Sequence, residues 1–311
     1  MKRPFIIDCD TGTDDAIALM AAFSRDQIEL KGITSVNGNV GEELTSRNNL
    51  ALTEYLGIDV PVMRGAKRPM GAGFVYHAED AHGRTGLGSV VIPDPAKTHF
   101  ESRIASEFIH DTAVELGGEL EILAIGPMTN LALTFVNYPE TTGLIKHLWF
   151  MGGAILGGNS VTSAEFNIWA DPDAAALVFN SGIPMTMVGL DVTDRAIMKP
   201  EQEAMLRASG GKAATLAADI LEFMFGRKSK GMEDAAMHDA LALASAVYPE
   251  CLTFEDHFVD VEVRGSYTRG HTMVDLRHRT GQAPNMQVAV DVDVEKFRAW
   301  LVDAVKATDS L

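Results

Sequence analysis

The feature that most constrains this chain of 311 residues is a regular alternation of short apolar runs with longer helix-like stretches. Runs typical of buried strands lie at Pro4–Ile7, Ile28–Val36, Pro61–Gly65, Leu120–Gly126, Leu148–Gly153 and Met185–Val192. Helix-like segments separate and follow them, at Ala16–Phe23, Glu42–Leu56, Ser102–Leu116, Thr129–Phe135, Asp173–Phe179, Gly211–Phe225 and Asp239–Val247. The alternation predicts an α/β fold with an open, mostly parallel, Rossmann-like sheet flanked by helices.

The pattern changes after about residue 255. Three strand-like runs, His257–Val263, Thr272–Leu276 and Met286–Val292, follow one another closely, and a helix-like segment, Val294–Ala307, comes after them. Closely spaced strands predict a small antiparallel addition near the C-terminus. No linker, repeat or boundary is visible, so residues 1–311 are expected to form one domain.

The charge of the chain limits its partners. A formal net charge of −17 repels nucleic acid and anionic membranes, while a neutral sugar or nucleoside is not excluded. No apolar run is long enough to span a bilayer and no apolar leader precedes the first strand, so we expect a cytoplasmic protein. Cys9 and Cys251 lie in or near apolar segments and are expected to be buried, reduced thiols.

Four aspartates, Asp8, Asp10, Asp14 and Asp15, crowd eight residues between the first strand and the helix that follows it. Open α/β sheets bind their ligands at such strand-to-helix turns. Carboxylates this close repel one another unless they are protonated, hydrated or neutralised by a cation. We favour a hard cation with oxygen ligands. The alternative is that these acids are turn and cap residues that favour a helix N-terminus electrostatically.

Other polar residues also follow predicted strands. They are Asn37, Asn39, Asn130, Asn159, the segment Glu165–Asn167, and the pair His238-Asp239. If the strands are parallel, these residues converge on one edge of the sheet and could bind a metal and a polyhydroxylated ligand together. Each has a structural alternative: the asparagines could serve turns that need φ > 0, and His238-Asp239 could cap a helix. The patternless stretch Ala66–Thr98, which contains His77 and His82, has the length of a functional loop.

Several common motifs are absent. The chain contains neither G-x-x-x-x-G-K-[ST] nor a G-x-G-x-x-G after a strand, and it lacks G-x-S-x-G and C-x-x-C. These absences argue against phosphate loops, serine hydrolysis and structural zinc.

The aspartate run Asp8–Ala16 resembles the signature of the calcium-dependent nucleoside hydrolases of the inosine-uridine-preferring type. Further segments that resemble this family follow in the same order along nearly the full chain. They are Val36–Asn39, Pro61–Ala66, His82-Gly83, Gly86–Gly88, Gly126–Leu131, Met151–Gly153, Glu165–Asn167, Asp171–Ala175, His238-Asp239 and Thr268–Gly270.

The resemblance implies hydrolysis of the N-glycosidic bond of ribonucleosides to ribose and free base. It implies a Ca²⁺ ion held by Asp10, Asp15, the main-chain carbonyl of Ile125 and Asp239, with Asp10 as general base and His238 as the acid for the leaving base. The implied substrate contacts are Asp14, Asn39, His82, Met151, Asn159, Glu165, Phe166 and Asn167. A homodimer or homotetramer and a role in nucleoside salvage are implied as well.

The sequence departs from the family pattern in two places. Thr11 stands where proline is frequent, and we expect little consequence because threonine can form the same turn. The segment Phe223–Met232, which helps to form the base pocket in the family, contains no tyrosine. Phe223 or Phe225 could stack on a base, and Arg227, Lys228 and Lys230 either stay in solvent or reach the substrate. The base preference is therefore left open.

Two other functions remain to be weighed. The segment Asp8–Thr11 resembles the D-x-D-x-[TV] motif of haloacid-dehalogenase-type phosphatases, in which Asp8 would be the nucleophile, but Gly12 occupies the fifth position. The second alternative is a protein that binds a nucleoside or ribose without catalysis, against which the presence of Asp10, Asp14, Asp15 and Asp239 together argues.

Overall fold

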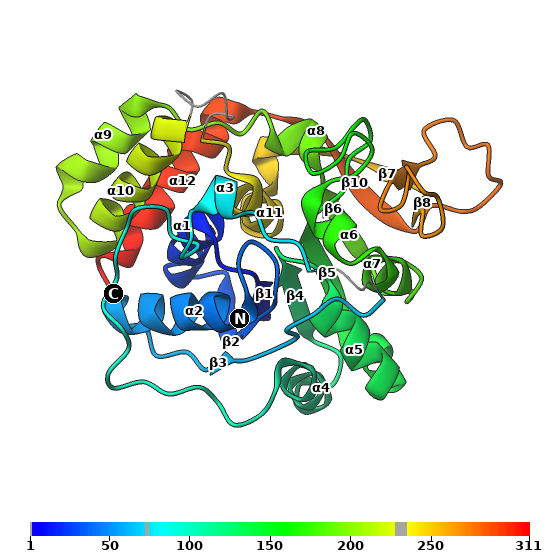
Figure 1. Ribbon diagram of the computed structural model, residues 1–311, viewed down its shortest axis with the longest axis horizontal. Coiled ribbons are helices and arrows are strands. Elements are labelled where there is room, and N and C mark those ends of the chain that lie inside the picture. Colours follow the sequence, from blue (N-terminus) through cyan, green and yellow to red (C-terminus); the bar gives the residue numbers. More distant parts are fainter. Residues whose placement is uncertain (1, 72–74, 228–234) are drawn as a thin grey trace.

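The computed structural model describes residues 2–71, 75–227 and 235–311. Figure 1 shows a central sheet with helices on both faces. Within the described residues, the main sheet has eight strands in the order β3-β2-β1-β4-β5-β6-β10-β7. Strand β7 runs antiparallel to β10, and the other neighbouring pairs are parallel. The prediction of a mostly parallel α/β sheet is confirmed.

The bounds of the elements are as follows. The strands are β1 Arg3–Cys9, β2 Ile28–Ser35, β3 Val62–Met63, β4 Leu120–Ala124, β5 Ile145–Met151, β6 Met185–Val188, β7 Leu252–His257, β8 Val259–Val261, β9 Thr272–Val274 and β10 Met286–Val292. The α-helices are α1 Thr13–Phe23, α2 Glu42–Leu56, α3 Glu79–His82, α4 Ala105–Leu116, α5 Thr129–Asn137, α6 Phe166–Ala170, α7 Pro172–Phe179, α8 Leu190–Thr193, α9 Pro200–Ser209, α10 Lys212–Arg227, α11 His238–Val247 and α12 Val294–Thr308. Two 3₁₀ turns are η1 Pro139–Leu144 and η3 Pro249–Cys251.

The strand order reverses next to β1. The chain moves outward from β1 to β2 and β3, returns to the other side of β1 with β4, and continues through β5 and β6. Adjacent βα connections leave the sheet in opposite directions at such a reversal, which opens a crevice at the carboxyl ends of the two central strands. The aspartate run begins at the carboxyl end of β1 and Ile125 follows β4, so both lie at this crevice.

The two faces of the sheet are buried by different helices. Phe5, Ile7 and Cys9 of β1 pack with apolar residues of α1, α2, α10, α11 and α12, while Ile6 packs on the opposite face with residues of α4, α5 and α7. This alternation is the period of two expected for a strand that is buried on both faces. Cys9 and Cys251 are both buried free thiols, as predicted.

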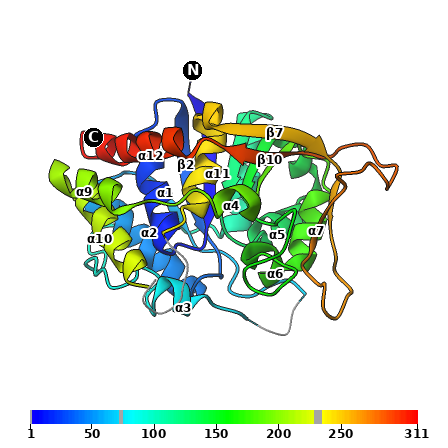
Figure 2. The same ribbon diagram turned by 90° about the horizontal axis from the view of Figure 1, so that it is seen from above.

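The C-terminal helix lies beside the N-terminal helix (Figure 2). The Thr308 hydroxyl donates to the carbonyl of Met20 at 2.5 Å, and the Ser24 hydroxyl donates to the carbonyl of Ala304 at 2.8 Å. Residues from the two ends of the described chain therefore complete one helical layer. No helix within the described ranges is both long and apolar enough to cross a membrane.

The C-terminal strands divide between two sheets. Strands β8 and β9 form the predicted small antiparallel pair. Strand β10 was grouped with them in the sequence but lies in the main sheet, parallel to β6 and antiparallel to β7. The predicted strand His257–Val263 is split, because β7 ends at His257 and β8 begins at Val259. A local apolar pattern predicts that a strand forms. It does not identify the neighbouring strand, because strand pairing depends on contacts between residues that are far apart in the sequence.

The loop after β3 is held at its far end by Glu54 of α2. The Glu54 carboxylate accepts hydrogen bonds from the backbone N–H groups of Ala96, Lys97 and Thr98 at 2.7–2.9 Å and from the Thr98 hydroxyl at 2.7 Å. These hydrogen bonds lower the pKa of Glu54 to about 2. The same loop carries α3 and His82, so Glu54 helps to fix a wall of the site described below.

Glu54→Gln is expected to lower the melting temperature at pH 7 and to speed proteolysis near residues 95–98. A depressed carboxyl pKa stabilises the fold above the ordinary value of 4.5, and this stabilisation is lost as the pH falls toward 2. The difference in Tm between wild type and variant should therefore shrink between pH 5 and pH 3. Glu115→Gln, at an exposed position on α4, is the matched control. A difference in Tm that does not change with pH would contradict a role for the carboxylate charge.

Candidate active site

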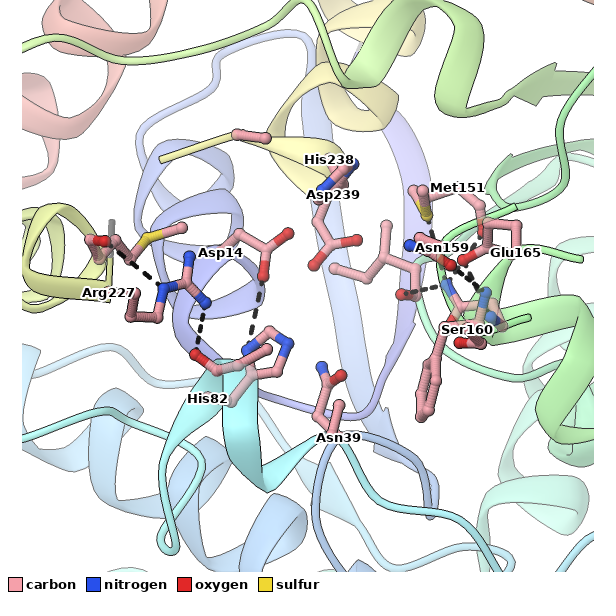
Figure 3. A pocket seen from close by; sticks show the side chains of 17 residues that line it. Asp14, Asn39, His82, Met151, Asn159, Ser160, Glu165, Arg227, His238 and Asp239 are labelled. Atoms are coloured by element: carbon pink, nitrogen blue, oxygen red, sulfur yellow. Dashed lines mark hydrogen bonds and ion pairs between the residues drawn. The ribbon is translucent and has the colours of Figure 1, made fainter. Parts of the chain in front are cut away.

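A cavity of about 370 Å³ opens at the crevice beside β1 and β4. Most of the predicted site residues line it: Asp14, Asn39, His82, Ile125, Met151, Asn159, Glu165, Phe166, Asn167, His238 and Asp239 (Figure 3). Lining residues that the sequence did not single out for the site are Ala78, Ala81, Ser160, Met224 and Ala236. The loop from residue 66 to 98 contributes to the wall, as its length predicted.

Two further predicted residues, Asp10 and Asp15, are buried at 0% exposure next to the cavity. Asp10 Oδ2 accepts a hydrogen bond from the backbone N–H of Asn39 at 2.7 Å. Asp15 Oδ2 accepts from the backbone N–H of Gly12 at 2.9 Å and from the Asn39 side-chain amide at 3.0 Å. The other oxygen of each carboxylate, Oδ1, is buried and has no hydrogen-bond partner among the described residues.

Gly38 allows Asn39 to approach Asp10 this closely. A Cβ atom at residue 38 would lie 2.0 Å from Asp10 Oδ2, which no side chain tolerates. The alternative that Asn37 and Asn39 serve a turn with φ > 0 is wrong, because His278 is the one residue other than glycine with positive φ in the described ranges. Asn39 instead binds two of the aspartates through its backbone and its side chain.

Carboxylates from two distant segments meet at the floor of the cavity. Asp14, Asp15 and Asp239 each place an oxygen within 4.8 Å of the others. Burial, and then the neighbouring carboxylates, raise the pKa of Asp239 and of Asp10 well above the ordinary range and that of Asp15 to about 7. A bound cation would offset the repulsion between these carboxylates and would give the unpaired oxygens a partner. The donor set therefore fits a metal ion that prefers oxygen ligands.

Asp8 does not take part in this cluster. Its Oδ1 accepts hydrogen bonds from the Thr34 hydroxyl at 2.5 Å and from the Asn130 amide at 2.7 Å, and its side chain is fully buried. Burial raises the pKa of Asp8 to about 7, and the two hydrogen bonds oppose this shift. The four aspartates of the motif thus separate, and Asp8 ties β1 to β2 and α5.

His82, the last residue of α3, lines the cavity. The backbone N–H of Thr13 donates to His82 Nδ1 at 3.1 Å, so Nδ1 is an acceptor and Nε2 carries the proton of the neutral ring. Burial is the main reason why the pKa of His82 falls to about 4; Asp14 opposes this shift, whereas Arg227 and His238 add to it. His82 is therefore neutral at physiological pH.

His238 is the first residue of α11 and lies directly before Asp239. Its Nδ1 lies 2.8 Å from the hydroxyl of Thr193 in α8. This contact orients the imidazole, whose ring is part of the cavity wall. Thr193 was not predicted, since nothing in the sequence connects α8 to α11.

The side of the cavity formed by β5 and α6 is held by a network of hydrogen bonds. The Glu165 carboxylate accepts from the backbone N–H groups of Gly153 and Asn167 at 2.9 Å and of Ile168 at 3.2 Å, and caps α6. The Asn167 amide donates to the carbonyls of Ile125 at 3.0 Å and Met151 at 3.1 Å.

Asn159 belongs to the same side, where its Oδ1 accepts from the backbone N–H of Phe166 at 2.9 Å. Burial raises the pKa of Glu165. These fixed polar groups can recognise several hydroxyl groups of one ligand.

Arg227, at the end of α10, lies across the cavity from Glu165 (Figure 3). It contacts the carbonyls of Met224 and Ala81, which also line the cavity. The sequence left open whether Phe223 or Phe225 stacks on a base, but neither lines the cavity in the described part of the chain. Phe223 packs against Gly88. Lys228 and Lys230 lie outside the described residues. Among the described residues of this segment, Arg227 reaches the site.

An acidic, metal-fitting floor beside groups suited to hydroxyls, at the switch point of a parallel sheet, defines a sugar-processing α/β enzyme. The chain belongs to the inosine-uridine preferring nucleoside hydrolase family, which it matches over residues 5–299. It is an N-glycosidase that hydrolyses ribonucleosides to ribose and free base. The metal dependence of this family agrees with the buried acidic cluster.

Individual relatives cover almost the whole chain. The pyrimidine-specific ribonucleoside hydrolase RihA of Escherichia coli O9:H4 (strain HS) is 39% identical over 98% of this chain and 99% of its own. The structure of a purine-preferring ribonucleoside hydrolase from Gardnerella vaginalis matches with a TM-score of 0.92 and 35% identity over 99% of both chains. A plant nucleoside hydrolase matches with a TM-score of 0.91 and 27% identity over 98% of this chain and 99% of its own.

The family membership settles the alternatives left open by the sequence. A binding protein without catalysis is excluded, because the family and the relatives of this chain are hydrolases. A phosphatase with Asp8 as nucleophile is also opposed by the structure, because Asp8 is buried and hydrogen-bonded to Thr34 and Asn130 outside the cavity lining.

Proposed function

We propose that this chain hydrolyses ribonucleosides with a Ca²⁺ ion held by Asp10, Asp15, Asp239 and the carbonyl of Ile125. The supporting observations are the buried carboxylate cluster of Asp14, Asp15 and Asp239, and the buried oxygens of Asp10 and Asp15 that have no hydrogen-bond partner among the described residues. A calcium ion bound there supplies positive charge that orders ribose hydroxyls and makes a neighbouring water molecule easier to deprotonate.

Asp10 is the proposed general base. Its Oδ2 is fixed by the backbone N–H of Asn39, so Oδ1 is the oxygen available to take a proton from water. The oxygen of that water then attacks the anomeric carbon while the bond to the base breaks. Burial and the neighbouring carboxylates raise the pKa of Asp10. A cation bound beside Asp10 would oppose both effects and favour the ionised carboxylate that a general base requires.

Asp14, Asn39, Asn159, Glu165 and Asn167 are the proposed ribose contacts. The backbone N–H donors fix Glu165, and its negative charge can stabilise the ribose as it becomes oxocarbenium-like. The remaining contacts are proposed for Met151 and Phe166 beside the sugar and for His82 beside the base.

The test is release of reducing sugar from a panel of ribonucleosides, with calcium and with a chelator. The panel needs both classes of base, since one relative is named pyrimidine-specific and another purine-preferring. We expect calcium-dependent release of ribose from at least one ribonucleoside. Release that continues unchanged after the metal has been stripped would overturn the proposed calcium mechanism.

His238 is the proposed acid that protonates the leaving base, and Thr193 orients its ring. His238→Ala is expected to lower kcat for inosine by about 10²-fold or more, the usual contribution of general acid catalysis. The loss should be much smaller for p-nitrophenyl riboside, whose leaving group needs no proton. Equal losses on both substrates would contradict an acid role. Thr193→Val is the companion variant, expected to show a milder loss with the same substrate dependence.

A further inference from the structure

Two adjacent asparagines, Asn48 and Asn49, lie in the middle of helix α2 and are both buried at 0% exposure. Asparagine is a poor helix former, because its side chain competes with the backbone for hydrogen bonds. A buried amide also costs free energy unless its polar atoms have partners. The partners of these two side chains lie in the turn that carries Asp10 and in the segments next to it.

Asn49 joins α2 to the end of β1, to β2 and to the turn. Its Nδ2 donates to the hydroxyl of Ser35 at 3.0 Å and to Cys9 Sγ at 3.3 Å. Its Oδ1 accepts a hydrogen bond from the hydroxyl of Thr11, with a weaker thiol contact from Cys9 at 3.6 Å. Asn49, Ser35, Cys9 and Thr11 are all buried at 0% exposure, so water does not compete for these bonds.

Asn48 holds the same turn through its backbone. Its Nδ2 donates to the carbonyl of Thr11 at 3.2 Å and to the carbonyl of Thr85 at 2.8 Å. Thr11 is therefore held by α2 through both its side chain and its carbonyl. Thr11, Asn48 and Asn49 are not among the residues that line the cavity, so α2 holds the turn from outside the cavity.

The turn needs such a restraint because neither neighbouring element supplies it. The strand pairing of β1 ends at Cys9, and α1 begins at Thr13, so Asp10 and Thr11 lie outside both elements. Threonine, unlike proline, leaves its own φ free to rotate, so the restraint at residue 11 comes from hydrogen bonds. In a reacting site, a displacement of about 1 Å can cost about 10²-fold in rate.

We propose that Thr11 and Asn49 are a positioning pair, whose hydrogen bond fixes the turn so that Asp10 Oδ1 is held where it takes a proton from water. This inference rests on the proposed function, because the pair acts through Asp10. Neither residue of the pair touches the substrate. The expectation that threonine at residue 11 has little consequence is thereby revised, since its hydroxyl gives the turn a fixed partner in α2.

Thr11→Val is the first variant of the test, because it keeps the shape of the side chain and removes the hydroxyl. The assay uses the ribonucleoside that the wild-type protein hydrolyses fastest, at saturating calcium. We expect kcat to fall about tenfold with little change in KM, the lower end of the losses seen when residues that orient metal ligands are removed. In thermal melts, the calcium concentration at half of the calcium-induced rise in Tm should increase by about tenfold for the same reason. Thr11→Ser keeps the hydroxyl and should recover most of both losses.

Asn49→Leu and the double variant Thr11→Val/Asn49→Leu test whether the two side chains act together. If they form a pair, the double variant has about the same kcat as Asn49→Leu alone, because each substitution breaks the same bond. If they act independently, the two losses multiply, and the inference is overturned. Should Asn49→Leu fail to fold, the comparison of Thr11→Val with Thr11→Ser still decides.

Thr53→Val is the matched control. Thr53 is a buried threonine of the same helix, and its hydroxyl donates to the carbonyls of Asn49 and Leu50 at 3.1 and 3.0 Å without reaching the turn. It should leave kcat and the calcium midpoint unchanged, whatever its effect on Tm.

A merely structural contact gives a different result. Thr11→Val would then lower Tm without changing kcat or the calcium midpoint, which would overturn the inference. A loss in Thr11→Ser as large as that in Thr11→Val would overturn it as well. Failure of the proposed function is seen in the wild-type protein itself, which would release ribose from no ribonucleoside or show no rise in Tm with calcium.

Discussion

Asp10→Asn is expected to lower kcat for ribonucleoside hydrolysis by about 10³-fold or more. The variant keeps the volume of the side chain and an oxygen that can accept from the backbone N–H of Asn39, so the fold should survive. It loses the negative charge and the basic oxygen Oδ1, which is buried without a partner in the described part of the chain. The measurement is kcat from reducing-sugar release at saturating calcium and substrate.

Asp8→Asn is the matched control for this variant. Asp8 is as deeply buried as Asp10 and lies two residues away, but its carboxylate bonds to Thr34 and Asn130 outside the cavity lining. We expect kcat of Asp8→Asn to stay within tenfold of wild type. Near-normal kcat for Asp10→Asn would exclude Asp10 as the base, and equal loss in both variants would indicate damage to the fold.

Removal of calcium is expected to abolish turnover and to lower the melting temperature by roughly 5 °C or more. An ion that binds only the folded state at 100 times its Kd stabilises that state by about 2.7 kcal/mol, and a protein of this size shifts by a few degrees per kcal/mol. Without the ion, the oxygens of Asp14, Asp15 and Asp239 face one another within 4.8 Å. The measurement is a thermal melt of chelator-treated protein during titration with calcium.

The variant Asp239→Asn separates site binding from general effects of salt. It removes one carboxylate of the cluster, so the calcium-induced rise in Tm should largely disappear. Magnesium in place of calcium should give a smaller rise, because it demands a tighter octahedral site. If millimolar calcium leaves the Tm of the wild-type protein unchanged, the proposed ion site is wrong, whatever the activity assay shows.

The local parts of this structure could be predicted from the sequence. The aspartate run spans the end of β1, the turn after it and the start of α1, as expected, because a short apolar run before it and an apolar helix after it leave one place for a turn. The direction of each aspartate could not be predicted. Asp8 is the last but one residue of β1, whereas Asp10 lies beyond its end, where the alternation of strand side chains no longer applies.

Contacts between segments that are distant in the sequence could be predicted only in part. Glu165 and Asp239 were predicted from their places near strand ends and from the resemblance to the family, and the structure brings both to the same cavity as Asp14. Arg227 could not be placed in the same way, since the residues around it depart from the family pattern. Its position depends on the carbonyl of Ala81 in a loop that has no periodicity to predict it.

The central position of β1 and the late position of β10 have a consequence for how this protein is made. Strand β10, which separates β6 from β7, and helix α12, which packs beside α1, are synthesised long after β6 and α1. Until then the apolar surfaces of α1 and β6 that they cover have no permanent partner. The nascent chain is therefore exposed to aggregation until both elements have left the ribosome, and chaperones are expected on it during that interval.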